Sequence, residues 1–433
     1  MMTNPMMPVR IQSIQALEIL DSRASPTIEC TVTLTDGSSG RAAVPSGASV
    51  GSQEVLELRD HQSKRYHGRG VLGVIDQMHA LIHPALEGQD PFDQVKIDDI
   101  LINLDGTPQK SKLGGNAILS ASLAVAHAAA SSIHQPLYRY LGGDAGCMLP
   151  MPLLNILNGG AHADNALDIQ EIMIVPVSAS SYQAALEMSV KVYQALKTLL
   201  LKKGLRITVG DEGGFAPEVT SNTEALNWVL QAIEAAGFKP GQDIAMALDV
   251  AASEFYTDGY YHLGSEHQRL DSAEWVERIQ AWVQSFPIVS IEDGMAEQDW
   301  AGWSQLTQAL GQHIQLVGDD VFVTQRSQLE RAIEQGAANA ILIKPNQVGT
   351  LSETLSTMRC AQAARYGVIV SHRSGETEDT SIVDLSVGLN AGQIKIGAPA
   401  RERALKYNQL LRIESDLGHL GLFSSGQALY NLN

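Results

Sequence analysis

Charged residues stand at the ends of short apolar runs throughout the second half of the sequence. Asp249, Glu292 and Asp319 close runs that read AMALD, IVSIE and QLVGD, and Lys344 and Lys395 close ILIK and QIK. Short runs rich in Ile, Val and Leu are typical of buried parallel strands. If these strand ends met, carboxylates and ammonium groups would be available together to hold a divalent cation and to move protons.

The spacing of these residues predicts that they do meet. The intervals between them are each about one strand plus one helix long, and the expected strands include Ala340–Ile343, Gly367–Val370 and Gln393–Ile396, with His372 after the second. In a (β/α) barrel the C-terminal strand ends converge on one face, where the chemistry lies. A strand also ends in a polar residue simply where the chain reaches water, but six such ends in register favour an enzyme.

Composition narrows the class of protein. The 433 residues suffice for two domains. A net charge of −18 argues against nucleic acid as the main substrate and is compatible with a divalent cation and a small anionic substrate. Cys30, Cys147 and Cys360 lack metal or redox spacing. Because no apolar run has the length of a signal peptide or of a bilayer span, we expect a cytoplasmic protein without membrane insertion.

The first part of the chain predicts a small α+β domain. Residues 9–60 alternate as antiparallel strands with a turn at Asp36-Gly37, and an Ala-rich helix should end before Pro136. His127 of this helix should be a structural or a surface residue. Gly142-Gly143 marks the expected boundary, which gives domains 8–143 and 144–433. The segment PSGASVG, residues 45–51, is either a linker or an active-site lid.

The second part predicts a closed α/β barrel. Two strands, in LPMPLLNILNGG and DIQEIMIVPV, flank a loop with His162, and helices are expected at Ser181–Lys203 and Asn222–Ala236. Six strand–helix units follow from Ala245, which makes eight strands in all. Between the two helices lies GDEGG with Glu212, a weak signal that a connecting turn explains equally well.

A set of long motifs resembles the enolase family, the glycolytic lyases. They are PSGAS, ELRD, GGAHADN, QEIM, GDEGGFAP, LDVAASEFY, SIEDG, GDD, LIKPNQ, SHRSGETEDT and QIK, and the match runs from about residue 17 to about residue 414. The resemblance implies a (β/α)8 barrel of ββαα(βα)6 order carrying a smaller N-terminal α+β domain. It also implies reversible dehydration of 2-phosphoglycerate to phosphoenolpyruvate with two Mg²⁺ per active site, the second arriving with substrate.

The resemblance assigns roles to individual residues. Asp249, Glu292 and Asp319 match the ligands of the first Mg²⁺, the last two also touching substrate, and Ser49 matches a residue of the second metal site that also contacts substrate. The other matches are Lys344 as the base at C2, Glu212 with Glu171 as the acid, Lys395 at the substrate carboxylate, Arg373 and Ser374 at the phosphate, and His162, Gln170 and His372 in the pocket, with His162 and Lys395 also counted as catalytic.

The reaction that the resemblance implies needs such residues. A proton beside a carboxylate is weakly acidic, so cations must stabilise the charge left by its removal. Lys344 must be neutral to act as a base, which nearby cations favour. Hydroxide leaves poorly at neutral pH, so a carboxylic acid is expected opposite the base. Arg373 offers a planar fork of donors to a phosphate.

Two other hypotheses remain. The chain could act on a different carboxylate as another member of the wider superfamily, although an intact SHRSG motif argues against a substrate without phosphate. Some enolases also occur at cell surfaces, as secreted proteins or in RNA-processing assemblies, which makes an interaction role the third hypothesis. The resemblance further implies a homodimer or an octamer.

Four positions depart from the usual family pattern: Ala24, Ser25, Val50 and Ile396. Val50 stands in the residue 45–51 loop where threonine is usual. Gly47 and Gly51 bracket the loop's centre, so it can swing with little strain. We expect this loop to be open or poorly ordered without substrate and closed with substrate and Mg²⁺.

Val50→Thr should lower the Mg²⁺ concentration needed for turnover and leave the first metal site unchanged. The added hydroxyl can make one hydrogen bond in the closed loop, worth roughly 0.5–1.5 kcal/mol. Turnover against Mg²⁺ concentration measures the effect. An identical Mg²⁺ dependence in both proteins would show that Val50 does not affect closure.

Overall fold

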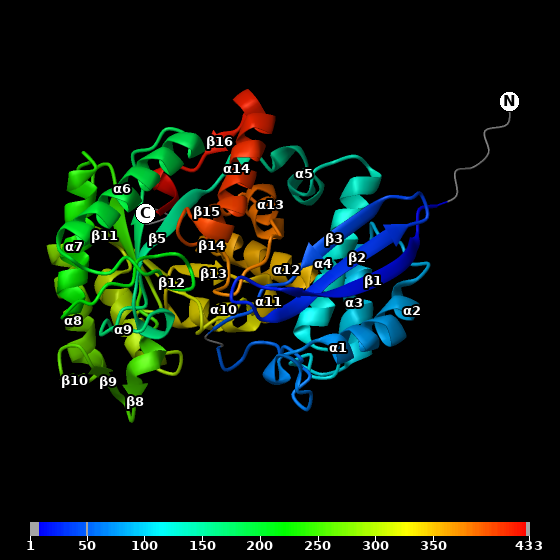
Figure 1. The fold of residues 1–433 in the computed structure, drawn as a ribbon, viewed down its shortest axis with the longest axis horizontal. Helices are drawn as coiled ribbons and strands as arrows, with labels where there is room; N and C mark the ends of the chain where they lie inside the picture. Colours follow the sequence, from blue (N-terminus) through cyan, green and yellow to red (C-terminus); the bar gives the residue numbers. More distant parts are fainter. Residues whose placement is uncertain (1–7, 49–50, 430–433) are drawn as a thin grey trace.

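The computed structural model describes residues 8–48 and 51–429, and Figure 1 shows a small sheet with helices beside a larger barrel. The sheet is antiparallel, with strands in the order β1 (Ile11–Leu20), β2 (Pro26–Leu34) and β3 (Ser39–Ala43). The turn between β2 and β3 falls at the predicted place, where Gly37 has a φ of 87° that a glycine adopts without strain. The expected antiparallel start of the chain is confirmed.

The Ala-rich helix α4 (Gly115–Ser132) forms the centre of this domain and is buried along almost its whole length. Strands β2 and β3 pack on it (Figure 1). A Cβ atom on Gly40 of β3 would lie 2.0 Å from the backbone nitrogen of Ala128, so only glycine permits this approach. His127 Nε2 lies 2.7 Å from Ser381 Oγ, which gives this histidine the predicted structural role, in a contact with the second domain.

Shorter helices complete the domain. They are η1 (Arg65–Gly68), α1 (Leu72–Gln77), the π-helical turn η2 (Met78–Ile82), α2 (His83–Leu86), α3 (Gln94–Asp105), α5 (Leu137–Gly142) and η3 (Gly143–Ala145). Within the described residues no single helix is long and apolar enough to cross a membrane. Among the same residues, one pair passes such a test together, Gly115–Ser132 with Leu137–Ala145, and it is bent by 93°.

Eight strands close into a barrel, as predicted. In chain order they are β5 (Met151–Asn158), β6 (Glu171–Val175), β7 (Ala245–Asp249), β11 (Ile288–Glu292), β12 (Gln315–Gly318), β13 (Ala340–Ile343), β14 (Gly367–Ser371) and β15 (Gly392–Lys395). All neighbours are parallel except that β6 runs antiparallel to β5 and β7. A short connection from β5 to β6 leaves no crossover helix, so β6 must return in the opposite direction.

Helices surround the barrel, and β6 and β7 are separated by two of them, as the ββαα(βα)6 order requires. They are α6 (Tyr182–Lys202), α7 (Asn222–Ala235), α8 (Ser272–Ser285), α9 (Trp300–Leu310), α10 (Arg326–Gln335), α11 (Pro345–Val348), α12 (Leu351–Ala363), α13 (Ser381–Gly388) and α14 (Ala404–Leu417), with the short turns η4 (Gly160–His162), η5 (Ala252–Phe255), η6 (Arg401–Arg403), η7 (Gly418–Leu420) and η8 (Gly426–Leu429).

Two small sheets were not predicted. Strands β8 (Tyr256–Thr257), β9 (Tyr260–Leu263) and β10 (Gln268–Leu270) form an antiparallel sheet between β7 and α8, and β4 (Met148–Leu149) pairs with β16 (Leu422–Phe423). The first sheet places Tyr261 in a stacked contact with Trp275 of α8, with ring centroids 5.5 Å apart.

Asp384 is a buried acid at a helix contact away from the barrel mouth. It lies on α13, where this helix packs on α5, and its Oδ1 accepts a hydrogen bond from the Tyr138 amide at 3.3 Å. Burial raises the pKa of its carboxyl to about 7 from an ordinary 3.8. The folded state therefore binds more protons than the unfolded state between about pH 4 and pH 7, so stability falls as pH rises through that window.

Asp384→Asn should increase stability at pH 8, on the order of 2–4 kcal/mol, with the gain vanishing near pH 4. Asparagine keeps an oxygen for the Tyr138 amide and removes the buried charge. Midpoints of urea unfolding at the two pH values measure the effect, and Asp416→Asn, an exposed site on α14, serves as the control. An equal gain at both pH values would contradict the assignment.

Candidate active site

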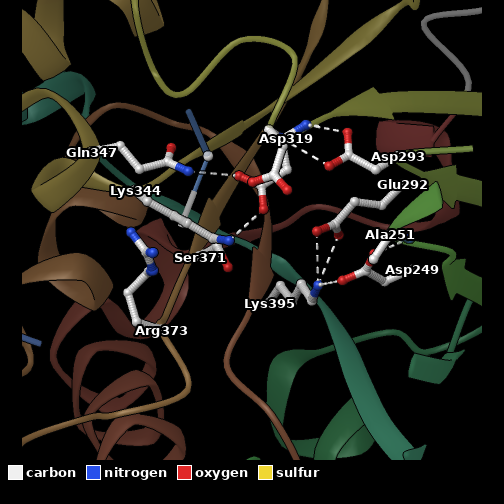
Figure 2. A network of polar contacts seen from close by, with 12 residues as sticks. Asp249, Ala251, Glu292, Asp293, Asp319, Lys344, Gln347, Ser371, Arg373 and Lys395 are labelled. Carbon is white, nitrogen blue, oxygen red and sulfur yellow. Dashed lines mark hydrogen bonds and ion pairs between the residues drawn. The ribbon is translucent and has the colours of Figure 1, made fainter. Parts of the chain in front are cut away.

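The charged strand ends converge at the C-terminal mouth of the barrel, as predicted (Figure 2). Asp249, Glu292 and Lys395 are the last residues of β7, β11 and β15, while Asp319 and Lys344 directly follow β12 and β13. The strand register pairs Glu292 with Asp249. All five side chains are nearly excluded from solvent.

A polar pocket opens at this mouth and collects most of the predicted site residues. It is lined by Gly47, Ala48, His162, Gln170, Glu171, Glu212, Asp249, Ala251, Asp293, Asp319, Asp320, Lys344, Ser371, His372, Arg373, Ser374 and Lys395. Glu292 joins this set through its contact with Lys395. Ser49 and Val50 lie outside the described residues, so the predicted loop state and the role of Ser49 stay predictions.

The reversed direction of β6 explains how its residues reach the mouth. Glu171 is the first residue of β6, and the antiparallel register places it opposite Asp249, the last residue of β7. Gln170 precedes it and its Nε2 donates to Asp249 Oδ2 at 3.4 Å. The second strand therefore presents its N-terminal end where the others present their C-terminal ends.

Glu212 enters the pocket because the GDEGG loop packs against β5. The Phe215 amide donates to the Ile156 carbonyl at 2.9 Å, and the Asn158 amide donates to the Phe215 carbonyl at 2.8 Å. A Cβ atom on Gly214 would lie 2.5 Å from Asn158 Oδ1, so the loop needs glycine to sit this close. The alternative of a bland connecting turn is wrong, because Glu212 is buried in the pocket.

Two histidines flank the carboxylate of Glu212. His372 Nε2 lies 3.2 Å from Glu212 Oε2, and His162 Nδ1 lies 3.8 Å from Glu212 Oε1 and 3.4 Å from Glu171 Oε1. Burial disfavours a charged His162, but Glu212 and Glu171 outweigh it and raise its pKa to about 9. Burial lowers the pKa of His372 to about 4.

The same cluster sets the charge of its acids. Burial favours a protonated Glu212, yet the neighbouring histidines and Lys395 hold its pKa well below the usual range. Burial and the charge of Glu212 raise the pKa of Glu171 to about 7. This arrangement favours an ionised Glu212, so a role as the acid requires that Glu212 receive a proton from a neighbouring group.

The two lysines are both held by carboxylates. Lys395 Nζ lies 2.9 Å from Glu292 and 3.0 Å from Asp249 (Figure 2). It also lies 3.2 Å from Glu171. Lys344 Nζ donates to Asp319 Oδ2. Burial opposes the charged form of each lysine, but the carboxylates outweigh it and raise both pKa values. Arg373 and Lys395 do favour a neutral Lys344, as predicted, but Asp319 and Glu292 have the larger effect and favour its charged form.

Sequence reasoning missed two residues that hold the turn after β12. Asp293 accepts hydrogen bonds from the backbone amides of Asp319 and Asp320, both at 2.9 Å. Gln347 Nε2 donates to Asp319 Oδ1 at 2.9 Å. Asp293 lies in the motif SIEDG and Gln347 in LIKPNQ. Their position in these two motifs is the sequence feature that could have identified them.

Two family models match the chain end to end. The model "Enolase, N-terminal domain" matches residues 11–141, and "Enolase, C-terminal TIM barrel domain" matches residues 146–432. The chain belongs to the enolase family. It is therefore an enzyme, a lyase of the enolase superfamily, and enolases typically use Mg²⁺.

The barrel mouth of this enolase fits a divalent cation. Oxygen atoms of Asp293, Asp319 and Asp320 lie within 4.8 Å of one another. Burial and mutual repulsion raise the pKa values of Glu292 and Asp293, and that of Asp320 to about 8, which shows a crowding of carboxyl groups that a bound cation would relieve. Oxygen donors crowded in this way suit Mg²⁺. The ligand set of Asp249, Glu292 and Asp319 remains a prediction.

Asp319→Asn should weaken Mg²⁺ binding about tenfold or more, since even second-shell changes cost that much. The variant loses a charged oxygen and alters the pairing of Lys344. Calorimetric titration with Mg²⁺ alone measures the affinity. Asp258→Asn, an exposed site in the β8–β9 turn, is the control. Equal affinity in the Asp319 variant and the parent would remove Asp319 from the site.

Proposed function

We propose that this enolase reversibly dehydrates 2-phosphoglycerate to phosphoenolpyruvate, a step of glycolysis and gluconeogenesis. The observation that supports this most is that one pocket contains Lys344, Lys395, Glu212 and Arg373. The substrate has a proton beside a carboxylate, a hydroxyl that must leave and a phosphate. Each of these three groups finds a chemically matching side chain in the pocket.

The first half of the proposed reaction is proton removal. Lys344 takes the proton from C2, the C2–H bond breaks, and its electron pair moves onto the substrate carboxylate. Lys395 faces this carboxylate with a positive charge, held by Asp249 and Glu292. Asp249, Glu292 and Asp319 would hold one Mg²⁺ and Ser49 would contribute to a second, and these ions would supply further positive charge for the carboxylate. With Asp319 bound to the cation, Lys344 would be able to lose its own proton and act as a neutral base.

The second half is loss of the hydroxyl from C3. The electron pair returns to form the C2–C3 double bond, the C3–O bond breaks, and the oxygen leaves as water after taking a proton at Glu212. That proton would come from His162, whose pKa Glu212 and Glu171 raise to about 9 against the effect of burial, once its ring approaches Glu212 more closely than the 3.8 Å seen here. Lys344 and Glu212 act in different steps, and β13 and β5, which position them, are three strands apart around the barrel.

The phosphate is assigned to the loop after β14. Arg373 and Ser374 line the pocket there, and Arg373 carries a charge that Glu54 and Asp319 stabilise. A superfamily member acting on a carboxylate without phosphate would have no use for this arginine. This supports 2-phosphoglycerate over another carboxylate substrate.

Two further proposals concern the setting of this reaction. We place the enzyme in the cytoplasm, where its substrate is produced and consumed, and cell fractionation tests this. We also propose a homodimer or an octamer, which light scattering of the purified protein distinguishes. The edge strand β1 exposes Leu17 and Leu20, which is compatible with a contact between copies.

Lys344→Ala and Glu212→Gln should separate the two steps. Lys344→Ala should abolish exchange of the C2 proton with deuterated water, and each variant should lose about 10²–10⁴ in turnover. Glu212→Gln should retain measurable exchange, because proton removal precedes loss of the hydroxyl. Proton NMR follows exchange, and phosphoenolpyruvate absorbance follows turnover. Normal exchange in Lys344→Ala would show that another group is the base, and a parent protein inactive on 2-phosphoglycerate would favour a different carboxylate.

A further inference from the structure

Residues at and just after the residue 45–51 loop contact three consecutive residues that follow β14, namely Arg373, Ser374 and Gly375. On the first side, Ser46 and Gly375 exchange backbone hydrogen bonds of 2.8 and 2.9 Å, and the Ala48 amide donates to Ser374 Oγ at 2.7 Å. On the second side, Glu54 contacts Arg373. The loop is thus anchored to the residues assigned to the phosphate.

Glu54 and Arg373 form a bidentate (two-pronged) ion pair. Arg373 NH1 donates to Glu54 Oε2 at 2.8 Å and NH2 donates to Oε1 at 3.2 Å, and both side chains are 4% exposed. A two-pronged pair fixes the plane of a guanidinium as well as its place. Arg373 NH1 also donates to Asn346 Oδ1 at 3.1 Å.

The carboxylate of Glu54 is itself held rigidly. Its Oε1 accepts from the Gly51 amide at 3.0 Å and from Gln347 Nε2 at 3.3 Å. The same Gln347 nitrogen donates to Asp319 Oδ1, next to Lys344 (Figure 2). Glu54 therefore connects Gly51 of the loop to Arg373. Through Gln347 it is also linked to Asp319, the carboxylate beside Lys344.

A role in stability alone explains these contacts poorly. A buried ion pair contributes little net stability compared with apolar residues of the same volume, because both charges lose their water. The Gly51 amide and Gln347 hold the Glu54 carboxylate against one edge of Arg373. This arrangement is better suited to orient the arginine.

We propose that Glu54 is a positioning residue that orients Arg373 for the substrate phosphate and connects it to Gly51 at the end of the residue 45–51 loop. This inference depends on the proposed function, in which Arg373 binds the phosphate. Glu54 does not touch the reacting carbon atoms. Its loss should therefore weaken binding of the phosphate more than it slows bond breaking.

Glu54→Gln tests the proposal in the full-length protein. The substitution keeps the size of the side chain but removes the charge and turns an amide toward the guanidinium. We expect KM for 2-phosphoglycerate and the Kd of inorganic phosphate to rise about tenfold or more, the effect of losing a charged hydrogen bond. We expect kcat to change less than about threefold. Glu54→Asp, which keeps the charge, should recover part of the affinity.

Glu87→Gln is the matched control, because it removes the same charge from the same domain at an exposed position outside the pocket. It should leave KM, kcat and phosphate affinity unchanged. Unchanged or tighter phosphate binding in Glu54→Gln would overturn the proposal, and so would a fall in kcat without a rise in KM. If the Gln variant does not fold, Glu54→Asp decides, and parental phosphate affinity in it counts against positioning.

The phosphate measurement separates this inference from the proposed reaction. A parent protein inactive on 2-phosphoglycerate whose phosphate affinity still depends on Glu54 would overturn the reaction and keep the positioning role.

Discussion

The barrel mouth is dominated by repulsion between buried carboxylates. Asp249, Glu292, Asp293, Asp319 and Asp320 meet there, and burial raises the pKa values of several of them. Two lysines offset only part of this charge. The need to balance this repulsion explains three features of the mouth. Each lysine is paired with carboxylates, backbone amides point toward Asp293, and the mouth can hold a divalent cation.

The barrel brings these groups together by strand direction. Parallel strands deliver five charged residues to one face, and β6, reversed because its connection to β5 is short, delivers Glu171 from its first residue. The GDEGG loop supplies Glu212 only because Gly214 can pack against β5. An α-helical crossover in place of the β5–β6 connection would send Glu171 to the far end of the barrel.

How much could be predicted depended on the range of the interactions. Strand ends such as Asp249 and Lys344 were predictable because apolar runs of four or five residues mark buried strands locally. Glu54 was not, since its segment has no helix or strand period and its partner Arg373 lies 319 residues away. The pairing of Lys344 with Asp319 and of Glu212 with two histidines could not be predicted, because no spacing in the sequence reveals those contacts.

The contact between Glu54 and Arg373 also crosses from one domain to the other. An isolated barrel would keep Arg373 but lose Glu54, Gly47 and Ala48, and with them one wall of its pocket. Neither half of the gene could then be exchanged for a foreign domain without also replacing its counterpart. The two domains therefore form a single unit of inheritance, and one hydrophobic cluster runs from Ile11 in the first domain to Leu417 in the second.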